Sequence, residues 1–107
     1  MVDVATKAPV YEGAANFQKN VETVGGKLLL YQDALVFEPH ILNVQKKSVL
    51  IALPSVSKIK LGWTKLLGFI PILPNAIIVY TDENKLYRFT VFHRKEWLRK
   101  IEPLRKK

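Results

Sequence analysis

The chain has 107 residues, of which 17 are lysine or arginine and 9 are aspartate or glutamate, so its net charge is +8. This length fits a single domain with its own core, and an apolar content of 49% is ordinary for a globular protein. The absence of cysteine excludes disulfide bonds and thiolate chemistry and fits a reducing compartment, so we expect a cytoplasmic protein. The basic balance favours anionic partners: nucleic acid, an acidic protein or an anionic membrane surface.

Short strands are predicted from about residue 10 onward. Apolar residues alternate with a period of two, and Gly, Pro, Asn and Asp separate the runs, which is typical of antiparallel β-structure. The runs read KLLLYQ, DALVFEPH, SVLIALP, VSKIKLGW, AIIVYTD and KLYRFTVF. In VSKIKLGW the predicted apolar face carries Ile59, Leu61 and Trp63, while Lys58 and Lys60 lie on the opposite face. We expect about seven strands in total.

The period of the apolar pattern changes near the C-terminus. Apolar residues recur there at i, i+4 and i+7, which predicts one stripe on an amphipathic helix. The stripe consists of Trp97, Ile101 and Leu104. We expect the helix to run from about Arg94 to Glu102, because Pro103 lacks a backbone N–H and clashes with the preceding turn. A single terminal helix of this kind covers one open end of a barrel or sandwich.

The order of several short motifs resembles the GRAM domain family, which belongs to the pleckstrin-homology-like fold. The matching positions are Gly26-Lys27-Leu28-Leu29-Leu30, Leu35-Val36-Phe37, Leu53-Pro54 with Val56 and Ile59, Pro74-Asn75 with Ile77, Val79 and Thr81, Tyr87-Arg88-Phe89, Arg94 and Trp97. The resemblance extends over most of the chain, here as a stand-alone domain.

This resemblance implies a mainly β fold. We expect a partly open barrel of two nearly orthogonal antiparallel sheets, with about seven strands and one C-terminal helix that covers an end. The domain is expected over residues 10–104, with residues 1–9 and 105–107 as flexible termini. Members of the family are non-catalytic modules that bind lipids or proteins at intracellular membranes. The matching positions are mainly core positions, so no ligand-binding residue transfers with them.

The residues themselves also argue against catalysis. His40 and His93 lack metal-ligand spacing to a second histidine, a cysteine or paired carboxylates. The glycine pair in VGGKL is not a phosphate-binding loop, because it precedes a strand and lacks the spaced glycine of that motif. We therefore predict no enzyme activity, no cofactor and no metal.

The stretch GWTKLLGFIPILPNAI, residues 62–77, is the most apolar part of the chain. It is too short for a membrane span, which needs roughly 20 mostly apolar residues, and Pro71 and Pro74 exclude a regular helix. We expect a strand–loop–strand arrangement. Its loop of about twelve residues would connect a strand that ends near Trp63 to one that begins near Ala76, and loops of this length are often functional.

Three interpretations of this stretch follow from the sequence. It folds back onto the barrel or lengthens the two strands; it contacts a partner protein or a second copy of the chain; or it inserts into a membrane interface, with lysines at the lipid phosphates. Peripheral binding to anionic phospholipid membranes is the leading function, and a protein-interaction or homo-oligomerisation module without a lipid ligand is the alternative. Nucleic acid is disfavoured, because the aromatic residues belong to the predicted core. The candidate binding residues are Lys58, Lys60, Trp63, Lys65, Leu66, Leu67, Phe69 and Ile70.

Overall fold

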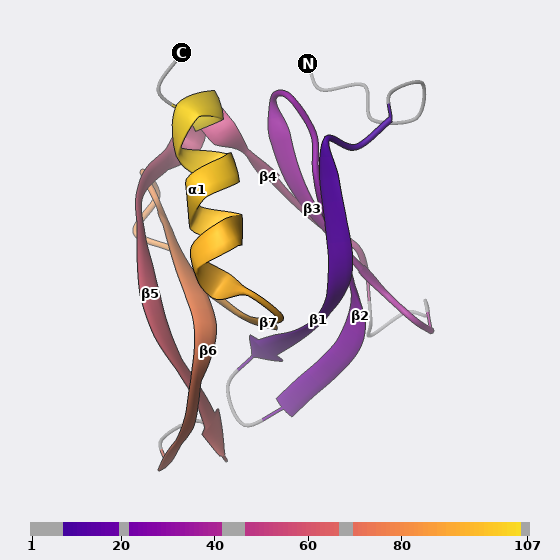
Figure 1. The fold of residues 1–107 in the computed structure, drawn as a ribbon, viewed down its shortest axis with the longest axis vertical. Coiled ribbons are helices and arrows are strands. Elements are labelled where there is room, and N and C mark those ends of the chain that lie inside the picture. Colours follow the sequence, from indigo (N-terminus) through magenta and orange to yellow (C-terminus); the bar gives the residue numbers. More distant parts are fainter. Residues whose placement is uncertain (1–7, 20–21, 42–46, 67–69, 106–107) are drawn as a thin grey trace.

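Seven antiparallel strands followed by one helix make up the fold (Figure 1). The computed structural model describes residues 8–19, 22–41, 47–66 and 70–105. The strands are β1 (Tyr11–Lys19), β2 (Glu22–Leu30), β3 (Ala34–Pro39), β4 (Val49–Ala52), β5 (Val56–Leu66), β6 (Ile70–Thr81) and β7 (Leu86–Val91); a 3-10 turn covers Leu53–Ser55 and the helix α1 covers Arg94–Arg105. The predicted mainly β fold with a C-terminal helix is confirmed.

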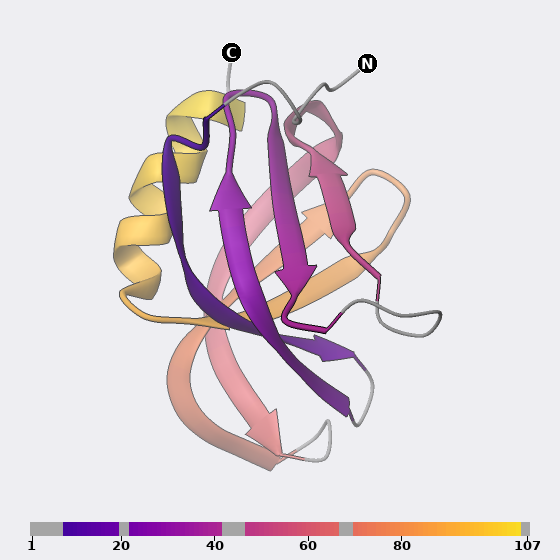
Figure 2. The same cartoon turned by 90° about the vertical axis from the view of Figure 1, so that its right-hand side faces the viewer.

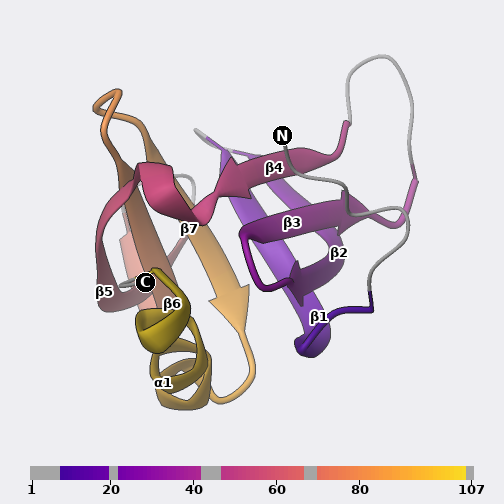
Figure 3. The same cartoon turned by 90° about the horizontal axis from the view of Figure 1, so that it is seen from above.

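The strands form one curled sheet in the order β4-β3-β2-β1-β7-β6-β5. Strand β1 joins the two halves, since it pairs along its length with β2 and, from Ala15 to Gln18, also with β7. Seen from above, β1–β4 stand opposite β5–β7, and α1 lies beside the second group (Figure 3). The curled sheet therefore encloses a core while β4 and β5 remain its two edge strands.

The core fills the space between the two halves of the sheet and α1. Period-two alternation along the strands turns one set of apolar side chains inward, and the helical stripe completes the enclosure. Trp97 is only 2% exposed, and its ring contacts the ring of Tyr11 edge-on at a centroid distance of 4.6 Å, which links α1 to β1. The largest fully buried side chains include Leu28, Leu30, Leu35, Phe37, Ile77, Val79, Phe89, Trp97 and Ile101.

The expected end of the helix at Glu102 is wrong, because α1 continues through Pro103 to Arg105. A proline in the last turn removes one hydrogen bond, to the carbonyl group of Arg99, and few helical residues follow it. Buried Ile101 and the packing of Leu104 against the core hold this last turn in place. Packing has therefore overridden the local preference of proline.

The expected loop of about twelve residues between Trp63 and Ala76 is also wrong. Strands β5 and β6 both run through this stretch, and residues 67–69 between them lie outside the described residues. The prolines fit because the register between the two strands shifts here, and Pro74 lies in one of these irregularities. Strand β7 pairs with β6 only from Ala76 onward, so a proline before Ala76 breaks no ladder on that side. Of the three sequence interpretations, the structure contains the longer hairpin.

The alternation predicted that Trp63 shares the face of Ile59 and Leu61, and this prediction is wrong. Trp63 is 47% exposed, whereas the other two side chains pack against the core. The register shift between Gly62 and Thr64 explains the difference, because it interrupts the regular alternation just before Trp63 would turn inward.

Candidate functional site

Exposed apolar side chains gather on the distal half of the β5–β6 hairpin. The hairpin projects past the ends of β1 and β2 in two perpendicular views (Figures 1 and 2). Four large apolar residues there are 40–53% exposed. They are Trp63, Ile70, Ile72 and Leu73, and we call them the hairpin patch. An apolar group of this kind on a projecting element is typical of an interaction site.

A side-chain amide from β1 holds the distal half of β5 in place. The Gln18 Nε2 group donates a hydrogen bond to the Lys65 carbonyl oxygen at 2.6 Å, and the Lys65 backbone N–H donates to Gln18 Oε1 at 2.8 Å. Because β5 is an edge strand, this amide replaces one residue of a missing neighbouring strand. The Gln18 amide thus fixes the strand end that leads to the hairpin tip.

Two arginines bind the same strand closer to the core. Arg88 Nη1 donates to the Trp63 carbonyl oxygen at 2.9 Å, and Arg94 Nη1 donates to the Gly62 carbonyl oxygen at 2.7 Å. The absence of a side chain at Gly62 makes room for this arrangement, since a Cβ there would lie 2.8 Å from Ile78 Cγ1 and 3.3 Å from Arg88 Nη1. Side chains from β1, β7 and α1 therefore position the hairpin.

Replacing Gln18 by alanine is expected to loosen the hairpin without unfolding the domain. The change removes both hydrogen bonds to Lys65, so stability should fall by about 1–2 kcal/mol and the Lys65 amide should exchange its hydrogen faster. Hydrogen exchange followed by NMR measures this residue by residue. The Gln18→Glu variant is the matched control, because its carboxylate still accepts from the Lys65 N–H but cannot donate to the carbonyl group. Unchanged exchange at Lys65 in Gln18→Ala would contradict the bracing role.

A basic cleft lies beside the distal half of the hairpin. It has a volume of about 430 Å³ and opens between the end of β1, the end of β5 and the start of β7. Four of its described lining residues are cations and none is acidic. The lining residues are Phe17, Gln18, Lys19, Lys65, Lys85, Leu86, Tyr87 and Arg88. Lys65 and Gln18 both line the cleft, and they are also the two residues whose hydrogen bonds fix the distal half of β5.

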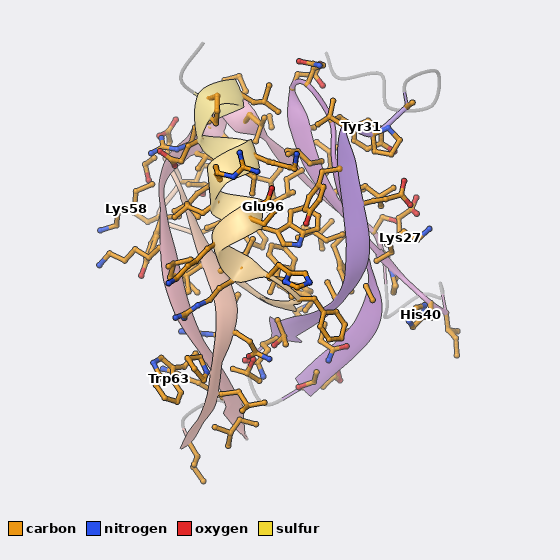
Figure 4. All side chains as sticks on the ribbon, in the orientation of Figure 1. Lys27, Tyr31, His40, Lys58, Trp63 and Glu96 are labelled. Atoms are coloured by element: carbon orange, nitrogen blue, oxygen red, sulfur yellow. The ribbon has the colours of Figure 1, made fainter. Side chains whose placement is uncertain are left out.

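The structure brings some of the sequence-predicted residues together and separates others. Trp63, Lys65 and Ile70 lie on the distal half of the hairpin, whereas Lys58 and Lys60 occupy the other half of β5, where their Nζ atoms lie 4.8 and 6.0 Å from the centre of the Tyr80 ring. Figure 4 shows Lys58 and Trp63 well apart along the strand. Leu67, Phe69 and the side chain of Leu66 lie outside the described residues.

Sequence reasoning missed several residues of this region. Ile72 and Leu73 were overlooked because the two prolines suggested a loop, although isoleucine is common in strands. Gln18 and the cleft residues Lys19, Lys85 and Arg88 come from distant parts of the sequence. Only the pairing of β1 with β7 brings them together, so no local signal could have found them.

Two kinds of feature are absent from the described ranges. These ranges contain no group of three or more histidine, cysteine, aspartate or glutamate side chains that could hold a metal ion. Within the same ranges, no helix combines the length and the apolar character that a bilayer crossing requires. His40 and His93, the two histidines of the chain, are both exposed.

Comparison with solved structures gives the class of fold. A domain from Leishmania infantum, described as the C-terminal domain of an unknown protein, superposes with a TM-score of 0.79 at 15% identity, over 97% of this chain and 89% of that chain. The DH/PH domains of PDZ-RhoGEF, solved in complex with activated RhoA, superpose with a TM-score of 0.72 at 16% identity, over 98% of this chain and 31% of that chain.

The Slm1-PH domain, solved in complex with phosphoserine, superposes with a TM-score of 0.59 at 12% identity, over 90% of this chain and 91% of that chain. Neither a protein-family model nor a curated protein sequence matches the chain. The likeness to two structures that contain PH domains, over 98% and 90% of this chain, shows that the protein has a pleckstrin-homology-like fold. At these identities the likeness concerns the fold alone.

Proposed function

We propose that this domain is a non-catalytic binding module that docks on anionic phospholipid membranes at their cytoplasmic face, and that it is a divergent relative of GRAM domains. The observation that carries the proposal is the hairpin patch, which exposes four large apolar side chains beside a cleft with four cations. An apolar tip that inserts and cations that meet lipid phosphates are the two terms that hold peripheral proteins at a membrane.

The free energies expected from apolar insertion and from charge attraction support this mode of binding. Apolar surface contributes roughly 25 cal/mol per Å² when it leaves water, so the half-exposed side chains of the hairpin patch together supply a few kcal/mol. Each cation near an anionic surface adds about 1 kcal/mol. Lys58 and Lys60 lie farther from the tip, so we assign them a weaker attraction to the anionic lipids. Salt screens this attraction, because the screening length at physiological ionic strength is about 8 Å. The phosphoserine bound in the Slm1-PH structure is an anionic phosphate compound and is consistent with this proposal.

Ile70→Asp combined with Leu73→Asp is expected to abolish most vesicle binding at low and at high salt. The two changes remove inserted apolar area and add charges that would have to enter the interface, and a loss of at least about tenfold in affinity follows from roughly 1.4 kcal/mol. Binding is measured by co-sedimentation with vesicles of phosphatidylcholine and phosphatidylglycerol. Trp63 reports insertion by its fluorescence, since Trp97 is buried and insensitive.

The matched control replaces two exposed apolar residues outside the hairpin, Leu50→Asp with Phe92→Asp. These changes add the same charge but leave the hairpin patch intact, so most of the binding should remain. Thermal unfolding first shows that both variants fold. If the unmodified protein ignores anionic vesicles at low salt and the hairpin variant converts a dimer to a monomer, the membrane proposal is refuted and an oligomerisation module takes its place.

A further inference from the structure

We infer that the outer face of strands β5, β6 and β7 binds single-stranded nucleic acid, an activity beyond the proposed membrane function. Side chains that alternate with the core residues of these strands point away from the core. The strand register places six of them in two adjacent rows across the three strands. The rows are Lys58–Tyr80–Leu86 and Lys60–Ile78–Arg88, and we call them the outer rows.

The outer rows carry positive charge without a neutralising carboxylate. Within the described residues, none of Lys58, Lys60 and Arg88 forms an ion pair. The two carboxylates at residues 82–83 belong to the turn after β6, and one of them pairs with a lysine of that turn. Cations on a sheet face that lack such partners attract the phosphates of a nucleic acid.

Two aromatic side chains on this part of the sheet are available to stack on bases. The sequence disfavoured nucleic acid because its aromatic residues belong to the predicted core, but Tyr80 and Trp63 lie outside the core. Tyr80 is partly exposed, with the Nζ atoms of Lys58 and Lys60 at 4.8 and 6.0 Å from its ring centre. Cation–π contacts at exposed sites are weak, so a base can take the ring face while an ammonium group moves to the adjacent phosphate.

Trp63 and Tyr80 mark the two ends of this site. Lys58 and Trp63 project from the same side of the hairpin (Figure 4). Gly62, next to Trp63, pairs with Ala76. Four residues of β6 separate that pair from Tyr80, which places the two rings on the order of 13 Å apart at about 3.3 Å per residue. In sheet-based RNA-binding modules, aromatic rings on the sheet stack two or three bases of a single strand.

The test measures fluorescence anisotropy of labelled oligouridylate and oligothymidylate of about ten nucleotides, a length typical of single-strand sites. Binding of either strand that depends on Tyr80 supports the site. Tyr80→Leu should weaken binding at least about fivefold because stacking is lost, whereas Tyr80→Phe keeps the ring and should keep the affinity. Stacking should also quench the fluorescence of exposed Trp63, while buried Trp97 stays unaffected.

The contribution of charge is measured by the salt dependence of the same binding. Lys58→Gln with Lys60→Gln should reduce the slope of log affinity against log salt by about 1.4, since each phosphate contact of a single strand contributes about 0.7. The control, Lys47→Gln with Lys95→Gln, removes the same charge from exposed positions outside the outer rows and should leave the slope unchanged. Equal changes of slope in the two double variants would overturn the site.

An abasic oligonucleotide of the same length keeps the phosphates but lacks the bases, so it should bind at least about fivefold more weakly. Equal binding of the abasic chain, or equally effective displacement by polyglutamate, would show a surface for anions or acidic proteins and would overturn the inference. Tyr80 lies outside the hairpin patch and the basic cleft, so Tyr80→Leu should retain vesicle binding. The absence of oligonucleotide binding at low salt would refute this site and leave membrane docking intact.

Discussion

Trp97→Ala is expected to lower the free energy of unfolding by about 3–5 kcal/mol. The indole ring is 2% exposed in the centre of the core, contacts Tyr11 and joins α1 to the curled sheet, so its removal leaves a large cavity that the surroundings fill only in part. Urea unfolding monitored by circular dichroism measures the change.

Trp63→Ala is the matched control for this experiment. The same substitution is made at a tryptophan that is 47% exposed, so we expect a change within about 0.5 kcal/mol. The comparison separates the loss of a core side chain from the loss of a tryptophan as such. Equal destabilisation by both variants would contradict the placement of Trp97 in the core.

Gly26→Ala is expected to cost about 3 kcal/mol, although it adds a single methyl group. A Cβ at Gly26 would overlap the carbonyl oxygen of Glu38 and lie 2.8 Å from both Phe37 Cζ and the Cα atom of Pro39. Two of these three atoms belong to the backbone of the paired strand β3, so no change of rotamer relieves the overlap. Strands β2 and β3 would have to separate at this point.

The neighbouring glycine offers a control one residue away. A Cβ at Gly25 would approach only side-chain atoms, of Asn16 and His40, each at 3.4 Å. Both of these side chains are exposed and have room to move, so Gly25→Ala should cost less than about 1 kcal/mol. Thermal unfolding of the two variants in parallel tests the difference, and similar melting temperatures would show that β2 and β3 are not in this close contact.

The elements whose apolar pattern agrees with their packing could be predicted from the sequence. The alternation in KLYRFTVF and the helical spacing that includes Trp97 and Ile101 correspond to β7 and α1, because burial on one face imposes those periods. The end of α1 could not be predicted, since local proline chemistry opposes the contacts of Ile101 and Leu104 with the core. These contacts join residues far apart in the chain and leave no local trace.

The site was harder to predict than the fold. Trp63 was recognised as a candidate, but the register shift that turns it outward depends on how β6 pairs with β5. The cleft was not foreseen, because Lys19 and Lys85 are separated by most of the chain and meet only through the pairing of β1 with β7. A net charge of +8 indicates an anionic partner but does not say where it binds.

The bracing of β5 by Gln18 has a consequence for how this domain could be re-engineered. The two hydrogen bonds to Lys65 fasten the distal part of β5 to β1 through the Gln18 side chain. A peptide from another protein grafted between Lys65 and Pro71 would therefore begin and end at paired positions that the strand ladder holds in register. Trp63, Ile72 and Leu73 would stay with the domain, so such a graft would change the tip alone and leave most of the hairpin patch in place.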